Sequence, residues 1–397
     1  MFRPIASGLS PNTTIMDVFI ALRAILSSKY WKDPLQLHLL KNWFTERYSS
    51  DQIYLFNAGR SALYFLLQAA GIKKGDEVIV QAFTCIGAIS PIVWIGAKPV
   101  YVDIDRNTYN LDPRLIEESI TSQTKAVIVQ HTFGIPADIH KIKQTCRRYK
   151  IILIEDCAVS MGAKSGAREV GTFGDAAFFS FGRDKVVSSV SGGVALINSP
   201  KLFVGADRLY SHISDLSLSW VRKQLLHPVA MLVIIPLYRI QLGKALLVLL
   251  QKLKLITKAY DQTEYLAIKP DTYPKRYPSV LVPLILNQLK NLDSMNNKRR
   301  LIASRYGPIL NGAIYLRYPV VVNNRKKLLT NARKQGIILG RWYSNVIDPE
   351  AINIRKFRYK KGTCPVAEDV AKHIVNLPTY PRLTSSEVKR VVKIIHE

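Results

Sequence analysis

The sequence predicts an α/β protein built on a mostly parallel β-sheet with helices on both of its faces. Two observations carry this prediction. Between residues 55 and 200, short β-branched runs alternate with helical stretches, and these runs are apolar almost throughout. Continuous apolar strands are typical of sheets buried on both faces. With 397 residues, 48% of them hydrophobic, the chain can form a large domain and a smaller second one.

Six segments are expected to be strands of this sheet. They are EVIVQAF (77–83), KPVYVDI (98–104), KAVIVQHT (125–132), IILIEDC (151–157), AAFFSF (176–181) and GGVALIN (192–198). Helices are expected between them, at 61–71 and 138–150. The second of these is amphipathic and ends in basic residues, which suit a helix C-terminus.

The chain divides into four parts by composition. Residues 1–50 are predicted to be a helical N-terminal lead-in that packs on the large domain, which spans 51–215. Residues 216–260 form a strongly apolar helical insertion, and 261–397 are expected to form a small C-terminal α+β domain. Prolines and basic residues interrupt the insertion before any stretch reaches the roughly 20 residues of a membrane-spanning helix. The insertion is either a buried hairpin or subunit contact, or an interfacial membrane anchor over 224–256.

The net charge of +27 is unevenly placed, because residues 201–397 carry 34 basic and 12 acidic side chains. Such a field attracts nucleic acid, anionic lipid or a phosphate-bearing substrate. No nucleic-acid-binding signature accompanies it, so no nucleic acid partner is expected. The four cysteines lie far apart, without the spacing of a disulfide framework or a metal site. The first residues lack the apolar core of a signal peptide, and a cytoplasmic protein is expected.

Three segments that are separated in the sequence are expected to meet at the carboxyl ends of parallel strands. Open α/β sheets bind their ligands at these ends. In NAGRSAL (57–63), Gly59, Arg60 and Ser61 would open a helix whose free amides can hold a phosphate. Gly59 could equally be a simple turn and Arg60 a surface residue. The other segments are IEDCA and FFSFGRDK.

In IEDCA (154–158) a buried strand stops at Asp156, and in FFSFGRDK (178–185) a strand ends at Ser180 and is followed by Lys185. Each feature alone has an ordinary structural explanation. Together they suit pyridoxal phosphate, which needs a lysine of lowered pKa for a Schiff base and a carboxylate at the pyridine nitrogen. It also needs neutral donors around its phosphate.

At these residues the chain resembles the DegT/DnrJ/EryC1/StrS family of sugar aminotransferases, which are fold-type I pyridoxal-phosphate enzymes. The resemblance extends over residues 55–200 and about the last 35 residues. It rests on GIKKGDEVIVQAFT (71–84), GAKPVYVDIDRNTYNLDP (96–113), HTFGIPADI (131–139), IEDCAVSMGAKSGAREVGTFGDAAFFSF (154–181) and CPVAEDVAKHIVNLPTYPRLT (364–384).

The resemblance implies that Lys185 binds the cofactor and shuttles a proton, and that Asp156 pairs with the ring nitrogen. It also implies that Ser180 and the turn at 59–61 hold the phosphate. Relatives with histidine at the position of Lys185 are dehydratases, so the lysine favours transamination. The implied reaction moves an amino group from glutamate to a keto group of a nucleotide-linked sugar, for surface polysaccharide or glycan synthesis. A homodimer is implied, in the cytoplasm or peripheral on the inner face of the membrane.

Three positions depart from the family pattern. Val159 stands where the family commonly has a glutamine, and Cys85 where an aromatic ring commonly stacks on the cofactor. Stacking could come from Phe83 or His131 instead, although His131 could also be a structural histidine. Ser191 replaces the acidic residue usual before the paired glycines. A variant substrate, a different acceptor on the same fold, and a weakened membrane-associated binding protein all remain open.

One further cluster lies outside these segments. Arg341, Trp342 and Tyr343 are placed to meet substrate from the small domain, or else to pack in its core.

Overall fold

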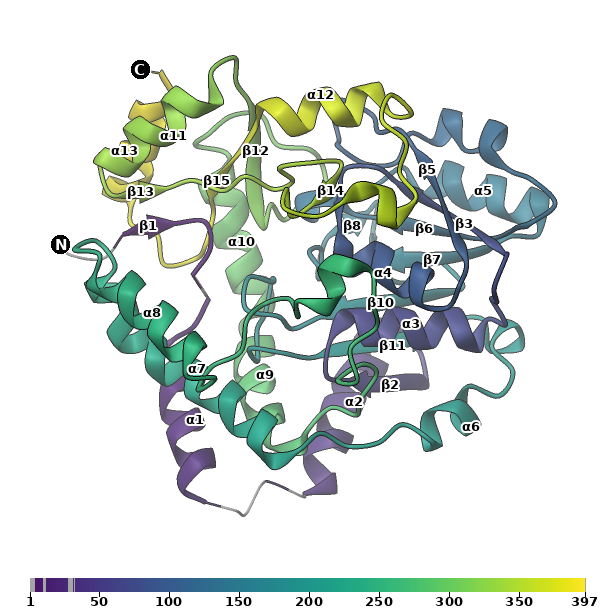
Figure 1. The fold of residues 1–397 in the computed structure, drawn as a ribbon, viewed down its shortest axis with the longest axis horizontal. Coiled ribbons are helices and arrows are strands. Elements are labelled where there is room, and N and C mark those ends of the chain that lie inside the picture. The colour runs from purple at the N-terminus through teal and green to yellow at the C-terminus, as the bar shows by residue number, and fades with distance from the viewer. Residues whose placement is uncertain (1–3, 10–11, 28–30, 32, 397) are drawn as a thin grey trace.

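The computed structural model describes residues 4–9, 12–27, 31 and 33–396, and a seven-stranded sheet lies at its centre (Figure 1). The strands are β2 (Gln52–Phe56), β3 (Glu77–Gln81), β5 (Lys98–Val102), β6 (Thr124–Gln130), β7 (Ile152–Asp156), β10 (Ala176–Ser180) and β11 (Gly193–Ile197). Their order is β2-β11-β10-β7-β6-β3-β5, and in this sheet β11 alone runs antiparallel to its neighbours. The prediction of a mostly parallel α/β sheet is confirmed, and β2 is the strand that the apolar runs did not reveal.

Helices cover both faces of the sheet, as expected. One face carries α3 (Gly59–Ala69) and α4 (Ile86–Trp94); the other carries α2 (Pro34–Tyr48), α5 (Ile139–Tyr149) and α9 (Val282–Leu289). Strand β10 shows how the sequence produces this arrangement. Phe178 lies in the core of the first face and Phe179 in the core of the second, because successive side chains of a strand point to opposite faces.

The N-terminal part reaches further than the sequence predicts. Helix α1 (Ile15–Leu26) begins with a capping box made by Thr14 and Asp17, and it packs on α7 (Leu218–Leu237) and α9. Ahead of it, β1 (Ile5–Ala6) pairs in parallel with β13 (Ile337–Ile338). The first described residues therefore pack on the C-terminal part of the chain and not on the large domain alone.

The C-terminal part contains a second small sheet and brings its loops over the edge of the large one. β12 (Arg317–Val321) pairs with β15 (Ile374–Pro378), and β14 (Ile347–Asp348) pairs with β4 (Thr84–Cys85), which follows β3. The remaining helices and strands are α6 (Ala206–Ser211), α10 (Leu292–Ala303), α11 (Arg325–Lys334), α12 (Pro365–His373), α13 (Ser385–His396), β8 (Lys164–Ser165) and β9 (Arg168–Glu169). The domain boundary at 261 stays a prediction, and α9 shares its core with the large sheet.

The insertion forms two helices at the edge of the molecule, α7 (Leu218–Leu237), which packs on α1, and α8 (Leu242–Lys252), which packs on α7 (Figure 1). The expected interruption is wrong for α7, because this helix continues through Pro228 and Pro236. By length and composition α7 could cross a membrane, but 39% of its most apolar stretch is buried inside the protein. A wholly buried hairpin is also ruled out, since Gly243 is the one buried residue of α8.

Candidate functional site

A cavity of about 360 Å³ lies at the carboxyl ends of β7 and β10, where the turn before α3 meets the C-terminal part. Seven of the nine predicted cofactor-binding residues line it: Gly59, Arg60, Cys85, Asp156, Val159, Ser180 and Lys185. The structure therefore brings together three segments that together span more than 120 residues of the sequence. Trp342 and Tyr343 also line the cavity.

Two predicted residues lie outside the cavity. Ser61 is fully buried, and its hydroxyl donates a hydrogen bond to Asn57 Oδ1 at 2.8 Å. Phe83 has a left-handed backbone (φ 64°) that turns its fully buried ring into an aromatic cluster, with its centroid 5.3 Å from that of Tyr343. Tyr343 is thus the ring of this cluster that lines the cavity. Arg341 does not line it and forms an ion pair with Glu350, with Nη1 3.6 Å from Oε2.

Lys185 presents an amine that is suited to nucleophilic chemistry. The side chain is half-buried, and its amine makes no hydrogen bond to the described residues. Burial lowers the pKa of Lys185, against the opposing charges of Cys85 and Asp156. A lysine of lowered pKa has a larger neutral fraction, and the neutral amine is the nucleophile.

A buried polar network, which sequence analysis missed, fixes the backbone at Lys185. The Asn12 amide donates to the carbonyl of Lys185 at 2.5 Å, and Arg299 donates to the carbonyl of Val186 at 2.7 Å. Arg299 is fully buried, and burial lowers its pKa to about 9. Gln288 completes the network by binding the backbone of both Asn12 and Ser188. Because these residues come from distant parts of the chain, no local pattern could have revealed them.

Asp156 is a buried carboxylate with one oxygen left open. Its side chain is 5% exposed, and Oδ1 accepts the amide of Ala158 at 2.9 Å. Oδ2 has no hydrogen-bond partner among the described residues. Burial raises the pKa of Asp156, while the hydrogen bond from the Ala158 amide and the nearby charge of Lys185 lower it. A cationic N–H donor at Oδ2 would compensate the burial of this charge.

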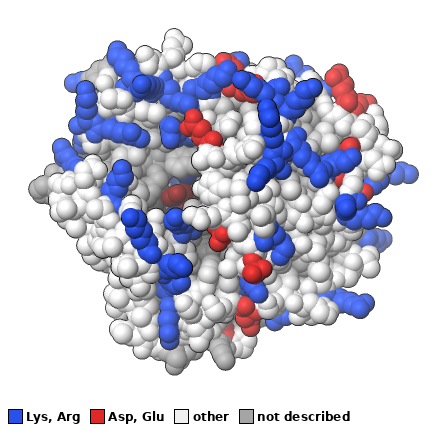
Figure 2. Space-filling view, in the orientation of Figure 1, with Lys and Arg blue, Asp and Glu red and all other residues white. Residues whose placement is uncertain are grey.

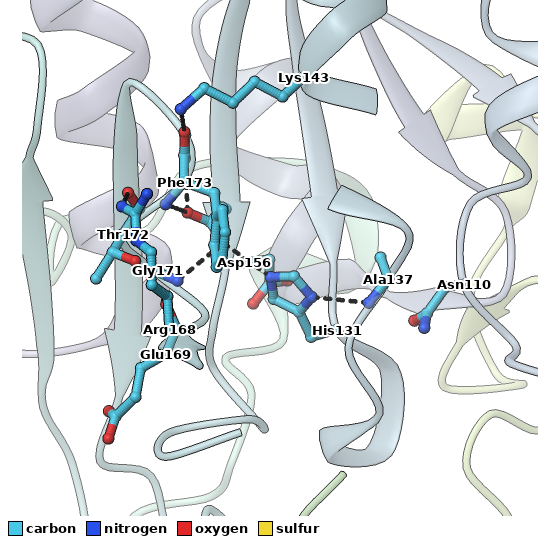
Figure 3. A network of polar contacts seen from close by, with 12 residues as sticks. Asn110, His131, Ala137, Lys143, Asp156, Arg168, Glu169, Gly171, Thr172 and Phe173 are labelled. Atoms are coloured by element: carbon cyan, nitrogen blue, oxygen red, sulfur yellow. Dashed lines mark hydrogen bonds and ion pairs between the residues drawn. The ribbon is translucent and has the colours of Figure 1, made fainter. Parts of the chain in front are cut away.

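His131 is a structural residue and is not among the residues that line the cavity. Its Nδ1 accepts the amide of Ala137 at 3.0 Å (Figure 3), and its Nε2 lies 3.1 Å from Glu155. Glu155 in turn accepts the amides of Gly171, Phe173 and Gly174 at 2.7–2.8 Å. The two carboxylates of IEDCA therefore have different tasks: Glu155 organises the loop before β10, and Asp156 faces the cavity.

The start of α3 and the end of β10 form a cradle for an anion. A Cβ atom on Gly59 would lie 2.9 Å from the Cβ of Ser180, so only glycine lets the helix approach this close. Ala58 offers no side-chain cap, which leaves first-turn amides for a ligand. Ser191 donates to the Asn57 carbonyl at 2.5 Å and holds this turn, although it lacks the acid expected there.

The cavity carries more positive than negative charge. Arg60 is neutralised by an ion pair with the buried Glu264. Arg317 is 6% exposed, and its guanidinium carbon lies 3.6 Å from the centroid of the Trp342 ring. No carboxylate of the described residues lies within ion-pair distance of it. Burial lowers the pKa of Arg317. It also lowers the pKa of Arg183, a second arginine in the cavity wall, to about 10.

These residues fit pyridoxal phosphate. The chain offers an amine of lowered pKa, a buried carboxylate with one free oxygen and an anion cradle, all in one cavity. The first suits the aldehyde of the cofactor, the second its ring nitrogen and the third its phosphate.

Comparisons with known proteins agree with this fit. The profile of the DegT/DnrJ/EryC1/StrS aminotransferase family matches residues 18–221 and 278–396. A pleiotropic regulatory protein of Geobacillus stearothermophilus is 28% identical over 85% of this chain and 82% of its own. GDP-perosamine synthase of Escherichia coli O157:H7 is 27% identical over 90% of this chain and 88% of its own.

Among solved structures, NtdA of Bacillus subtilis with bound cofactor PMP superposes with a TM-score of 0.76. The match covers 100% of this chain and 85% of that one at 19% identity, which shows a shared fold. The expected fold class is confirmed.

Proposed function

Because the chain belongs to the DegT/DnrJ/EryC1/StrS family and is a pyridoxal-phosphate-dependent aminotransferase, we propose that it aminates a keto group of a nucleotide-linked sugar with glutamate as donor. The observation that carries the substrate class is the charge of the cavity. Five basic and two acidic side chains line it, and Glu264 neutralises only one of the five. Arg183, Lys258 and Arg317 are left for anionic ligands, such as a carboxylate and a diphosphate.

Each side chain has a defined task in this proposal. The bound cofactor supplies an aldehyde carbon that carries the amino group and a ring that accepts electron density. Lys185 would hold the cofactor through its amine and would move the proton of the reacting substrate carbon. Asp156 would pair with the ring nitrogen, and the Gly59–Ser180 cradle would hold the phosphate.

Arg317 is assigned to the carboxylate of the amino donor. It is the cation of the C-terminal part that reaches the cavity wall, and its Nε lacks a hydrogen-bond partner. The ring of Trp342 supports its guanidinium from one side, and Nη2 donates one hydrogen bond to the Asp184 carbonyl at 3.3 Å, which leaves the other edge of the group available. An arginine with free edge donors binds a carboxylate through two parallel hydrogen bonds.

The name of the relative GDP-perosamine synthase supports a nucleotide-linked sugar product. The proposal also places the protein in the cytoplasm, as a homodimer that serves surface polysaccharide or glycan synthesis. Light scattering of the purified holoprotein tests the dimer.

Half-reactions test the proposed chemistry. The visible absorption of the protein-bound cofactor should fall when glutamate is added and return when a keto sugar nucleotide follows. Return with a simple keto acid but with no keto sugar nucleotide would contradict the sugar assignment. No change on adding any amino acid would contradict aminotransfer altogether.

A further inference from the structure

The segment from 216 to 260 combines exposed apolar side chains with charged side chains that are all basic. It contains seven basic residues and no acidic residue; the basic ones are Arg222, Lys223, Arg239, Lys244, Lys252, Lys254 and Lys258. None of the catalytic tasks above uses the outer face of this segment. We propose that this face docks on the surface of an anionic lipid bilayer.

The docking face, called the α8 face below, is defined by its exposed residues. They are Leu242, Lys244, Ala245, Val248, Leu249, Lys252, Leu253, Lys254 and Leu255. Val248 and Leu249 are 42% and 50% exposed, and they share one shallow depression with Lys244 and Lys252. Apolar and basic groups thus lie on the same side of the helix. In Figure 2 the surface over α7 and α8, at the lower left, is white and blue without red.

The size of the helices favours a position along the membrane surface. The 11 residues of α8 extend only about 16 Å, whereas the apolar core of a bilayer is about 30 Å thick. Helix α7 is long enough to cross, but Leu225, Pro228 and Ile234 are buried against the protein. Spanning would remove these side chains from their core. Docking along the surface leaves the fold intact, with leucines in the acyl boundary and lysines at the headgroups.

The charge distinguishes lipid from other partners. In a two-fold symmetric dimer the same patch meets itself, so the lysines of the α8 face would approach the same lysines of the second copy. Like charges at such a contact are unfavourable. Nucleic acid would satisfy the lysines but would leave the leucines and valines in water. An anionic bilayer accommodates both kinds of side chain.

The test is co-sedimentation of the holoprotein with vesicles of phosphatidylcholine, alone or mixed with phosphatidylglycerol. We expect binding to the anionic vesicles only, and weaker binding at high salt. The double variant Lys244→Gln, Lys252→Gln should bind about 30-fold more weakly, because each lysine at the surface contributes a factor of about five. Val248→Ser with Leu249→Ser should lose at least about tenfold.

The matched control is Lys326→Gln with Lys327→Gln, which removes two adjacent exposed lysines from α11. This variant should bind like the wild type. Thermal unfolding and cofactor absorption establish that each variant is folded. Three outcomes would overturn the proposal: no binding of the wild type to either vesicle, equal binding to both, or an equal loss in the control. If the wild type formed an oligomer that dissociated in the double variant Val248→Ser, Leu249→Ser, and did not bind vesicles, the face would be assigned to contact with a second copy of the chain.

Discussion

The two walls of the cavity differ in origin. The wall formed by the sheet edge carries Gly59, Asp156 and Lys185, and it lies within the part of the chain that the family profile matches. The covering wall includes Gln224, Thr257–Tyr260 and Tyr273, and it lies within residues 222–277, which the profile leaves unmatched. We therefore expect the reaction type to depend on the wall that the family profile matches, and the choice of substrate to depend on the wall that it leaves unmatched.

The walls also differ in how their polar groups are satisfied. At the sheet edge, Glu155 and Asp156 receive backbone amides, and the Lys185 segment is tied down by Asn12 and Arg299. Lys258, on the covering wall, has no ion-pair partner among the described residues, and helices α7 and α8 contain no acidic residue. The sheet-edge wall, whose polar groups are held by hydrogen bonds, suits chemistry that requires fixed geometry. The cationic covering wall suits the binding and release of anionic ligands.

The largest expected effect is that of Lys185→Ala. It should lower kcat by about a thousandfold or more, because it removes both the covalent anchor and the proton shuttle. Steady-state amino transfer is the measurement. Lys258→Ala makes the same chemical change on the covering wall and should spare the glutamate half-reaction. Equal losses in the two variants would erase the distinction between the walls.

Asp156→Asn should lower kcat by about a hundredfold or more, since a neutral amide cannot stabilise a protonated ring nitrogen. The variant should still bind the cofactor through Lys185 and the phosphate cradle. Absorption spectra and half-reaction rates check both statements. Full activity in this variant would show that the carboxylate is not needed at the ring.

Arg317→Gln should reduce kcat/KM for the amino donor by about 10- to 100-fold, the usual loss of a charge-assisted pair. The loss should appear mainly in the KM of the donor. Arg341→Gln is the control, because Arg341 is adjacent in sequence to Trp342 of the cavity but pairs with Glu350 and does not line the cavity. A variant with unchanged donor KM and raised sugar KM would move Arg317 to the diphosphate.

The smallest effect concerns stability at the sheet edge. Burial alone raises the pKa of Glu155, but hydrogen bonds from His131, Gly171 and Gly174 bring it below its usual value. The stabilisation is thus complete above the unfolded pKa of about 4.3 and is lost as the pH falls through the folded pKa. Glu155→Gln should cost about 1–3 kcal/mol of unfolding free energy near neutral pH.

Chemical denaturation at several pH values measures this cost. The difference from the wild type should narrow below about pH 4.3, whereas the exposed control Glu117→Gln should show little difference throughout. A gap that widens on acidification would contradict the assignment to Glu155.

The sequence predicted the sheet well because its strands are buried on both faces and therefore form continuous apolar runs. It predicted Asp156, Ser180 and Lys185 at the cavity because parallel strands end at one common edge. Strand β2 was not predicted because only three residues separate it from the end of α2; its five residues are as many as β3 or β10 has. The prolines of α7 suggested interruptions that the helix does not show, because packing on α1 holds it together.

The rest of the site depends on backbone geometry and on hydrogen bonds and strand pairings that the sequence pattern does not reveal. The backbone of Phe83 turns its ring away from the cavity, and the hydroxyl of Ser61 finds its partner four residues back, at Asn57. Arg317 reaches the cavity because β12 pairs with β15, which comes more than 50 residues later in the chain. Such long-range pairings cannot be obtained from spacing alone.

Lys185 is the residue on which the proposed chemistry depends most directly. Borohydride reduction of the holoprotein makes the bond between a lysine and the cofactor permanent, and peptide mass spectrometry then locates the added mass. We expect that mass on Lys185 and on no other residue. Labelling of Lys258 in place of Lys185, or a cofactor that adds to no lysine, would contradict the site.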